Sequence, residues 1–225
     1  MKGFFARLKK GIRAGPPRFK SQDRYRSITY PQSGFKLREK LVLSKIGEIQ
    51  IKKHRELKGT LKTLIIKKTP TNKWFANFTS EVELEPRKSN KKKVGIDFGL
   101  SNLATLSDGT KIENPKYLKK SEQRLIFYQR NLSKKKNGSK NRSKARFSLA
   151  KIHEKILNQR TDYLHKISRM IANSYGTIVV ENLNIQNMLK NHHLAQSISD
   201  SSWKELLQML CYKAEEAGSR VVVVE

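Results

Sequence analysis

Short apolar runs that alternate with polar residues characterise the chain between Phe35 and about Glu85. A two-residue period is typical of strands that bury one face. Glycines and a proline separate the runs, which are Leu41–Leu43, Ile46–Ile51, Leu61–Ile66 and Trp74–Phe78. The pattern predicts a small antiparallel β-unit with Lys and Arg on its polar positions.

The segment before this unit, residues 1 to about 33, is rich in Gly, Pro, Arg and Lys and has few helix signals. We expect a basic loop or arm there. A second polar and basic segment, Pro86–Lys93, is typical of a linker. We therefore predict one domain at 1–90, made of the arm and the β-rich unit, and a second at 91–225.

The second domain opens with three strand signals. Val94–Asp97 predicts a buried strand, and Leu103–Leu106 and Lys111–Ile112 predict two more. Asp108-Gly109 lies between the last two and is a typical two-residue hairpin turn. We expect three antiparallel strands here.

A helical pattern follows at about 117–173, and a turn is predicted within 134–140, where a charge run meets Asn137-Gly138. In the second helix the apolar residues recur at three- and four-residue steps, with an interruption at Arg160. They are Leu149, Ile152, Ile156, Tyr163, Ile167 and Met170. The pattern predicts a helical hairpin with one basic surface.

Two more strands and a helix complete the second domain. The β-branched run Thr177–Glu181 predicts a central strand that is covered on both faces. Ser202–Glu205 is a capping-box signature, and the apolar stripe after it ends at Gly218, before a fifth strand at Val221–Val224. The predicted fold class is α/β, with a mixed sheet preceded by a small antiparallel β-rich unit.

The charge balance indicates a polyanionic partner. Lys and Arg number 48 against 19 Asp and Glu, a net charge of +29. Nucleic acid is the expected partner, because neutralised phosphates release condensed counterions; a ribosomal-type structural protein or a merely basic surface is the alternative. No run approaches the roughly 18 apolar residues of a membrane helix, and the N-terminus lacks a secretory signal. We expect no membrane partner and a location in bacterial or archaeal cytoplasm.

Cysteine, tryptophan and histidine give weaker signals. Cys211 is the only cysteine, so the chain has neither an internal disulfide nor a cysteine-based zinc site. Its apolar helix pattern predicts a small core residue. Trp74 and Trp203 are expected to be core anchors rather than base-stacking platforms, and His192-His193 to be exposed in a polar loop.

Two carboxylates, Asp97 and Glu181, each end an apolar strand and precede a flexible or polar segment. In open mixed sheets ligands collect outside strand ends, and carboxylates on rigid backbone there can hold a divalent ion. Mg²⁺ prefers oxygen ligands, and two-metal phosphodiester cleavage uses such clusters. Singly, each residue is more often a turn or cap residue; the pair makes both candidate metal ligands.

Several segments match one family in combination. In the second domain they are Lys93–Leu100, the basic helical pair, Ile178–Leu183 and Ser199–Trp203, and in the first Pro17–Ser21, Thr29–Phe35 and Lys73–Phe75. Together they resemble the TnpB (OrfB) proteins of bacterial insertion sequences, and the segments of the first domain resemble the β-rich wedge region of that family. The resemblance covers nearly the whole chain.

The resemblance implies an RNA-guided DNA endonuclease with a partial RuvC (ribonuclease H-like) domain at 91–225. Asp97 and Glu181 match the family's first and second catalytic carboxylates, which bind Mg²⁺. Its partners would be DNA and a guide RNA, whose base pairing supplies sequence specificity. Basic residues of the arm and hairpin would follow nucleic-acid backbone: Arg18, Lys20, Lys134, Lys135, Lys136, Lys140, Arg142, Lys144 and Arg146.

The sequence departs from the family pattern at both ends. After the equivalent of Val221–Val224, family members carry a zinc ribbon of two Cys-x-x-Cys pairs and then a third catalytic Asp. Before the equivalent of Phe4-Phe5, they carry another strand and a helical region. We therefore expect a truncated nuclease that cuts DNA poorly alone, because losing one carboxylate of a metal cluster costs orders of magnitude in rate. This interpretation leaves room for a complementing protein fragment as a partner.

Two other function classes stay open. Ile96–Gly99 also fits the opening strand of actin-like phosphotransferases, although the charge and the missing second Asp-x-Gly turn count against them. The other class is a non-catalytic DNA- or RNA-binding fragment, a repressor or a decayed gene product. A protein that had long lacked catalysis would not be expected to keep Asp97 and Glu181 intact. A recent truncation would explain why both carboxylates are present in a chain without catalysis.

Overall fold

The computed structural model describes residues 2–11, 15–16, 25–83, 90–183, 185–188 and 190–224. Two of the predicted nucleic-acid contacts, Arg18 and Lys20, lie outside these residues. The chain divides into two compact units, Met1–Glu83 and Leu84–Glu225.

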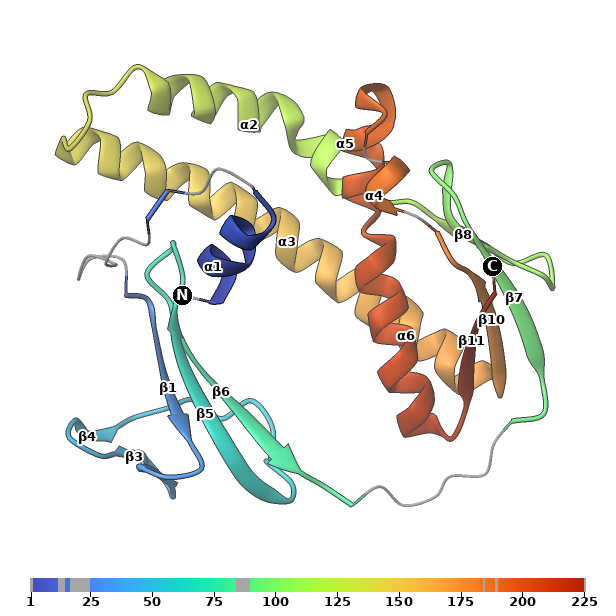
Figure 1. Cartoon of the computed structure of the whole chain (residues 1–225), viewed down its shortest axis with the longest axis horizontal. Helices are drawn as coiled ribbons and strands as arrows, with labels where there is room; N and C mark the ends of the chain where they lie inside the picture. The colour runs from blue at the N-terminus through green and yellow to red at the C-terminus, as the bar shows by residue number, and fades with distance from the viewer. Residues whose placement is uncertain are drawn as a thin grey trace. The chain divides into compact units, whose positions relative to one another are not determined.

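The described part of the first unit contains one helix and two small antiparallel sheets (Figure 1). One sheet has the order β1-β5-β6, formed by β1 (Ser27–Pro31), β5 (Thr60–Lys68) and β6 (Trp74–Glu81). The other has the order β2-β3-β4, formed by β2 (Phe35–Leu37), β3 (Leu41–Leu43) and β4 (Gly47–Ile49). The predicted antiparallel β-unit is confirmed.

Two elements lie in the segment where the sequence predicts a loop or arm. The helix α1 spans Lys2–Lys9, and β1 begins at Ser27. Apart from Gly3, the glycines and prolines that indicate a loop begin only at Gly11, which leaves one helical stretch before them. Pairing with β5 stabilises β1, and the proline that ends this strand is a residue typical of loops and strand edges, so the sequence alone indicates a loop.

A cluster of three fully buried leucines, Leu41, Leu43 and Leu64, forms the core of the first unit. Half-buried Phe35, Ile66 and Phe78 pack around them, together with other apolar residues from both sheets. Each buried leucine contributes about 2 kcal/mol by leaving water. This core is small, so much of the apolar surface of the first unit stays open.

The second unit contains a mixed five-stranded sheet of order β11-β10-β7-β8-β9. β7, β8 and β9 are antiparallel neighbours, whereas β10 runs parallel to both β7 and β11. The strands span Lys93–Phe98 (β7), Asn102–Leu106 (β8), Lys111–Glu113 (β9), Thr177–Glu181 (β10) and Arg220–Val224 (β11). The mixed sheet is confirmed, as is the hairpin turn at Asp108-Gly109, where Gly109 has a φ of +88°.

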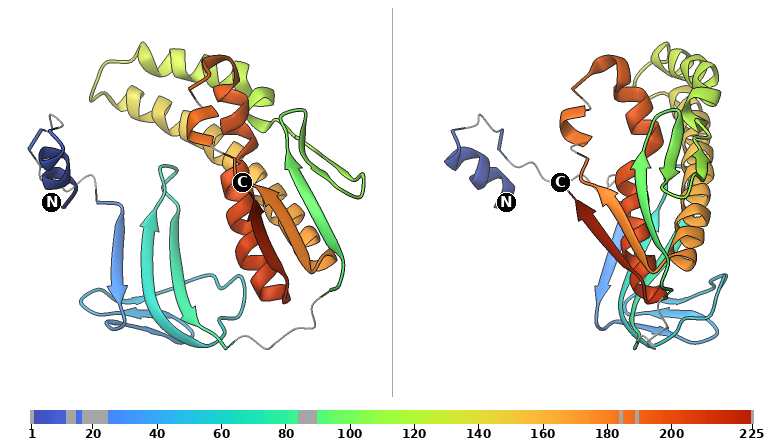
Figure 2. Two further views of the ribbon diagram at one scale, coloured as in Figure 1. Left: turned by 45° about the vertical axis from the view of Figure 1, so that its right-hand side comes forward. Right: turned by 90° about the vertical axis from the view of Figure 1, so that its right-hand side faces the viewer.

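Five helices of the second unit lie in the described residues: α2 (Tyr117–Ser133), α3 (Lys140–Ser174), α4 (Ile185–Met188), α5 (His192–Ser201) and α6 (Trp203–Ala217). α2 and α3 form the predicted hairpin, with Gly138 at a φ of +79° in the turn between them. α3 and α6 lie on one face of the sheet (Figure 2). None of the described helices is long and apolar enough to cross a membrane.

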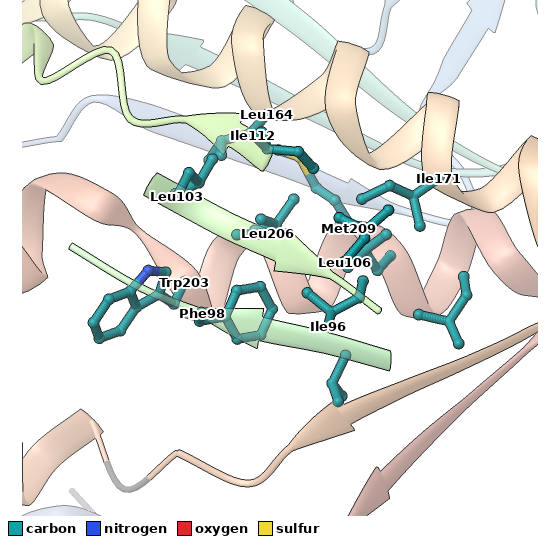
Figure 3. Packing of buried hydrophobic residues seen from close by; sticks show 14 of the residues in the cluster. Ile96, Phe98, Leu103, Leu106, Ile112, Leu164, Ile171, Trp203, Leu206 and Met209 are labelled. Atoms are coloured by element: carbon teal, nitrogen blue, oxygen red, sulfur yellow. The ribbon is translucent and has the colours of Figure 1, made fainter. Parts of the chain in front are cut away.

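The main core lies between the sheet and these two helices (Figure 3). Ile96 and Phe98 of β7 pack with Leu164 of α3 and with Trp203 and Leu206 of α6. The side chains of β7 alternate between this core and the opposite face, as a half-buried strand requires.

The expectation that Thr177–Glu181 is covered on both faces is wrong. Ile178 and Val180 are buried, but Val179 is only half-buried and Glu181 is exposed. The β-branched run fits the central place of β10 between β7 and β11, and in the described part of the unit α3 and α6 cover one face of the sheet.

The start of α6 differs from the capping-box prediction. Ser202 has a left-handed φ of +53°, and its side chain makes no capping hydrogen bond. The Ser202 hydroxyl donates instead to the Ser199 carbonyl of the preceding helix, because α5 ends directly before α6 and leaves no extended cap residue. The predicted end of α6 is confirmed, with Gly218 at a φ of +74°.

Four single-residue predictions also differ from the structure. Met170 and Cys211 are exposed, because the buried stripes of α3 and α6 turn away from them, to Leu164 and Ile171 in α3 and to Leu206, Leu210 and Ala214 in α6. His192 begins α5 rather than lying in a loop. Trp203 is a buried core anchor as expected, but Trp74 is 60% exposed.

Candidate active site and nucleic-acid interface

The register of β7 and β10 brings Asp97 and Glu181 together. Ile96 and Val180 are the last paired residues of this parallel ladder, so Asp97 and Glu181 occupy the next position on neighbouring strands. Adjacent strands lie roughly 5 Å apart, which is close enough for two carboxylates to share an ion. Both side chains are exposed, and both lie on the sheet face opposite the main core.

Backbone hydrogen bonds hold both positions. Asp97 is paired with Thr105 of β8, and Glu181 with Val224 of β11. After Glu181 the Asn182 N–H donates to the Val224 carbonyl at 2.8 Å, which keeps the strand end fixed. The two carboxylates are therefore carried by strands with partners on both sides.

A tight turn follows Asp97. The Gly99 N–H points to the Leu103 carbonyl at 3.4 Å, and a Cβ atom on Gly99 would lie 3.0 Å from the Asn102 carbonyl oxygen. A side chain here would press on backbone that cannot rotate away. Gly99 thus lets β7 turn back directly into β8 beside the carboxylate.

Within the second unit, α3 and α6 lie on the sheet face opposite to the one that carries Asp97 and Glu181 (Figure 2). Val179, Val222 and Val224 share the face of the two carboxylates by their strand register. The two carboxylates accept but do not donate hydrogen bonds when ionised, and such oxygens suit a hard, partly hydrated ion such as Mg²⁺. Among the described residues, no group of three or more His, Cys, Asp and Glu side chains is placed to hold a metal.

Two other carboxylates of this unit are already engaged. Asp108 accepts a hydrogen bond from the Tyr175 hydroxyl, which lowers the pKa of Asp108 and raises the pKa of Tyr175. Asp200 accepts from Arg160 and from the backbone of α2. Neither is presented as a further metal ligand.

The hairpin of α2 and α3 carries a long run of positive charge. Residues 123–153 contain ten Lys and Arg and no Asp or Glu. The predicted contacts that are exposed here are Lys134, Lys135, Lys136, Lys140, Lys144 and Arg146. Such a run along one hairpin is the electrostatic footprint of phosphate binding.

Arg142 has a structural role in this turn. It is half-buried, and its Nη1 donates to the carbonyls of Leu132 at 3.0 Å and Lys135 at 2.9 Å. Its backbone N–H is in turn bound by the Ser139 hydroxyl, which caps α3. The guanidinium therefore closes the C-terminal end of α2, where carbonyls lack helical partners.

Polar contacts that no sequence pattern predicts link the loop after Asp97 to the helices. The Asn114 amide donates to the Leu100 carbonyl at 3.2 Å and to the Ser201 hydroxyl at 3.0 Å. Nearby, Arg160 and Asp200 form a largely buried ion pair with an N–O distance of 2.5 Å. The sequence holds one indication of this ion pair, because Arg160 is the charged residue that interrupts the apolar stripe of the second helix.

Comparison with known proteins settles the family. Residues 75–192 match the OrfB_IS605 family, described as "Probable transposase". The chain belongs to this family. The resemblance to TnpB (OrfB) proteins is thus confirmed on a match of more than half the chain.

Two relatives share the description of a putative RNA-guided DNA endonuclease. A Streptomyces pristinaespiralis protein named "Putative RNA-guided DNA endonuclease" is 38% identical over 227 residues, covering 99% of this chain and 55% of the relative. The Escherichia coli K12 protein "Putative RNA-guided DNA endonuclease InsQ" is 32% identical over 231 residues, covering 94% and 57%. The chain thus spans little more than half the length of these relatives.

More distant matches lie among the Cas12f1 proteins. The Sulfoacidibacillus thermotolerans "CRISPR-associated endodeoxyribonuclease Cas12f1" is 26% identical over 171 residues, covering 68% of this chain and 39% of that protein. A solved Cas12f1–sgRNA–target DNA complex matches with a TM-score of 0.51 and 19% identity over 73% of this chain and 36% of that chain. This structural match shows a likeness of fold.

Proposed function

We propose that this OrfB-family chain carries nucleic-acid-binding surfaces and part of the nuclease site of a TnpB-type, RNA-guided DNA endonuclease. The observation that carries the proposal is the adjacent placement of Asp97 and Glu181 at the ends of two parallel strands, on an open face of the sheet. We take residues 91–225 as a partial RuvC (ribonuclease H-like) domain with the hairpin inserted at about 117–173. Residues 1–90 would be the arm and wedge-like, nucleic-acid-binding domain.

Asp97 and Glu181 would hold Mg²⁺ in this proposal. When bound, the ion would polarise a phosphate oxygen and acidify a water molecule. The contribution of the chain is to fix two negatively charged oxygen donors on rigid strands and to leave their face open to a phosphodiester. Gly99 supports this by allowing the tight turn beside Asp97.

The hairpin would bind the nucleic-acid backbone. Lys134, Lys140 and Arg146 are among its exposed basic residues. The stretch of the hairpin around them contains no Asp or Glu that would neutralise their charge. Contacts of this kind add affinity without sequence preference, so base pairing with a guide RNA would supply the specificity. DNA and guide RNA are the proposed partners.

We expect the chain alone to cleave slowly. The proposed site has two carboxylates, and two-metal cleavage needs further ligands to orient the second ion. A complementing protein fragment that supplies another carboxylate would then restore the rate.

The decisive experiment measures Mg²⁺-dependent cleavage of plasmid DNA by the purified chain with co-expressed RNA, beside an electrophoretic binding assay at several salt concentrations. We expect salt-sensitive binding and little cleavage, and binding should survive Asp97→Ala. Fast cleavage that Asp97→Ala abolishes would contradict the expected impairment. Absence of any salt-sensitive binding would refute the proposed function.

A non-catalytic DNA- or RNA-binding protein is the second candidate. The observation in its favour is that the described residues present a pair of carboxylates rather than a larger metal-binding group. The two candidates differ in Mg²⁺ binding at Asp97 and Glu181, because a binder has no need of the ion. The non-catalytic candidate would be favoured if the chain binds nucleic acid and Asp97→Ala leaves its Mg²⁺ binding unchanged.

A further inference from the structure

The first unit contains an open apolar groove of about 820 Å³. Leu41, Leu43, Ile66 and Phe78 lie in its floor, which is the outer side of the small core. Exposed Ile46 and Ile49 line it as well. Apolar surface of this extent on a small β-unit is typical of a binding site rather than of a solvated face.

Trp74 lies at this groove. It is 60% exposed, and strand register places it opposite Lys68 and on the same face as Ala76 and Phe78. The Lys68 Nζ lies 5.4 Å from the centre of the Trp74 ring, a cation–π contact that helps to fix the indole. An exposed, oriented indole is an efficient surface for stacking a flat ligand.

The charge around the groove identifies the class of that ligand. Residues 50–78 contain eight Lys and Arg and one acid, Glu56. Lys52, His54 and Arg55 line the groove directly, next to Gln50. A basic rim around an aromatic, apolar floor suits a polyanion that also has flat apolar parts, and unpaired nucleotides combine these two properties.

We infer that this groove, named here the Trp74 groove, binds unpaired bases of single-stranded RNA, with one base stacked on Trp74 and the phosphates on the basic rim. The choice of RNA rests on the proposed function, in which a guide RNA contributes unpaired loops and ends. Gln50, which lines the groove, can hydrogen-bond to a ribose hydroxyl, the group that distinguishes RNA from DNA. The residues that line the groove all belong to the first unit, whereas Asp97, Glu181 and the hairpin belong to the second.

The two tryptophans allow a direct test on the full chain. Trp203 is buried in the second unit and serves as an internal reference, whereas Trp74 is exposed at the groove. Titration with a short oligouridine should quench the exposed emission, and an abasic RNA of the same length and charge should not. Trp74→Ala should weaken oligouridine binding by about 5- to 150-fold, the range for one stacked base, and leave abasic binding unchanged.

Two lysines on one strand provide a matched charge control. Lys68 lies against Trp74, whereas Lys67 is exposed, pairs with Phe75 and lies on the opposite face of β5. Both changes, Lys68→Gln and Lys67→Gln, remove one positive charge. Lys68→Gln should weaken oligouridine binding more than Lys67→Gln, because it also releases the indole.

The outcomes separate this inference from the proposed function. Salt-sensitive binding that is equal for oligouridine and abasic RNA, and indifferent to Trp74→Ala, would overturn the Trp74 groove and leave the proposed function standing. A DNA strand that binds as tightly as RNA in a Trp74-dependent way would overturn the choice of RNA. Loss of all salt-sensitive binding would count against both.

Discussion

Arg160 and Asp200 join three helices of the second unit. Arg160 Nη2 in α3 donates to Asp200 Oδ1 in α5 at 2.5 Å, and the two Asp200 oxygens lie 3.3 and 3.2 Å from the Leu118 N–H at the start of α2. The residue before α2, Lys116, has a left-handed φ of +50° and provides no side-chain cap. Asp200 therefore caps α2 from another helix while neutralising Arg160.

Removal of Asp200 should destabilise the second unit strongly. Its side chain is 7% exposed and that of Arg160 19%, so Asp200→Ala leaves a largely buried guanidinium without its carboxylate. We expect the free energy of unfolding to fall by roughly 3 kcal/mol or more. Urea denaturation followed by circular dichroism measures this change.

The matched control is Asp162→Ala, which breaks the ion pair with Lys166 on the same α3 helix. Both of those side chains are mostly exposed, at 64% and 72%, so water replaces the lost partner. The control should unfold at nearly the same urea concentration as the unmodified chain. Equal effects of the two substitutions would show that the Arg160–Asp200 pair has no special structural weight.

Asp97 and Glu181 should bind Mg²⁺ as a pair without contributing to stability. Asp97→Asn and Glu181→Gln keep the size of exposed side chains, so we expect changes in unfolding free energy within about 0.5 kcal/mol. Mg²⁺ binding, measured by calorimetric titration, should be lost in either variant and retained in Asp162→Asn. Retention of Mg²⁺ binding in both single variants would mean that the ion does not bind between these two residues.

Lys213 should make stability depend on alkaline pH. It is 4% exposed in the interface of α3 and α6, where its Nζ donates to the His165 carbonyl at 2.7 Å and to the Ser168 hydroxyl at 2.8 Å. Burial lowers the pKa of Lys213 below the ordinary 10.5, with nearby Arg169 acting in the same direction and Glu216 opposing it. Between the two pKa values the unfolded chain binds more protons, so stability should rise with pH in that window.

Lys213→Met tests this dependence, because methionine fills a similar volume without the cost of burying a charge. We expect the variant to be more stable at neutral pH by roughly 1 kcal/mol and to have a flatter dependence on pH up to about 10.5. Denaturation at several pH values measures both effects. A less stable variant with an unchanged slope would show that the two hydrogen bonds of Lys213 outweigh the cost of its burial.

Gly59 should tolerate no side chain. It has a φ of +76°, and a Cβ atom there would lie 2.0 Å from the Glu81 carbonyl oxygen at the end of β6. Gly59→Ala should cost roughly 3 kcal/mol or more, from left-handed strain plus the clash. The matched control is Gly47→Ala, because Gly47 has a φ of +97° but open space around it, and only the strain of about 1 to 2 kcal/mol should appear. Thermal unfolding of both variants separates the cost of the left-handed backbone strain from the cost of the steric clash.

Local patterns predicted most strands and helices of this chain. Asp108-Gly109 and Gly138 mark turns that the structure confirms, and Gly218 ends α6, because each of these positions depends on the backbone of a few residues. Asp97 and Glu181 were singled out for a similar reason, since each follows an apolar strand. That the two strands are neighbours follows from the sheet order, which no local pattern contains.

The failures share a cause in tertiary packing. Trp74 continues an alternating strand pattern, but it lies beyond the small core of three leucines, and the described residues leave it 60% exposed. Arg142 belongs to the run of cations in its turn, and only the geometry of α2 reveals the carbonyls that it binds. Asp200 likewise needed a partner 40 residues away in the chain.

The position of β11 has a practical consequence for handling the protein. In the described part of the chain β11 pairs with β10 and with no other strand, and it exposes three valines, Val222, Val223 and Val224. Such an edge invites pairing with the same edge of another copy, and the repulsion of a +29 chain opposes it. Concentrated salt shortens the range of that repulsion from about 10 Å at 0.1 M to about 3 Å at 1 M. The salt wash that strips nucleic acid from a preparation should therefore also be the step at which the protein begins to self-associate.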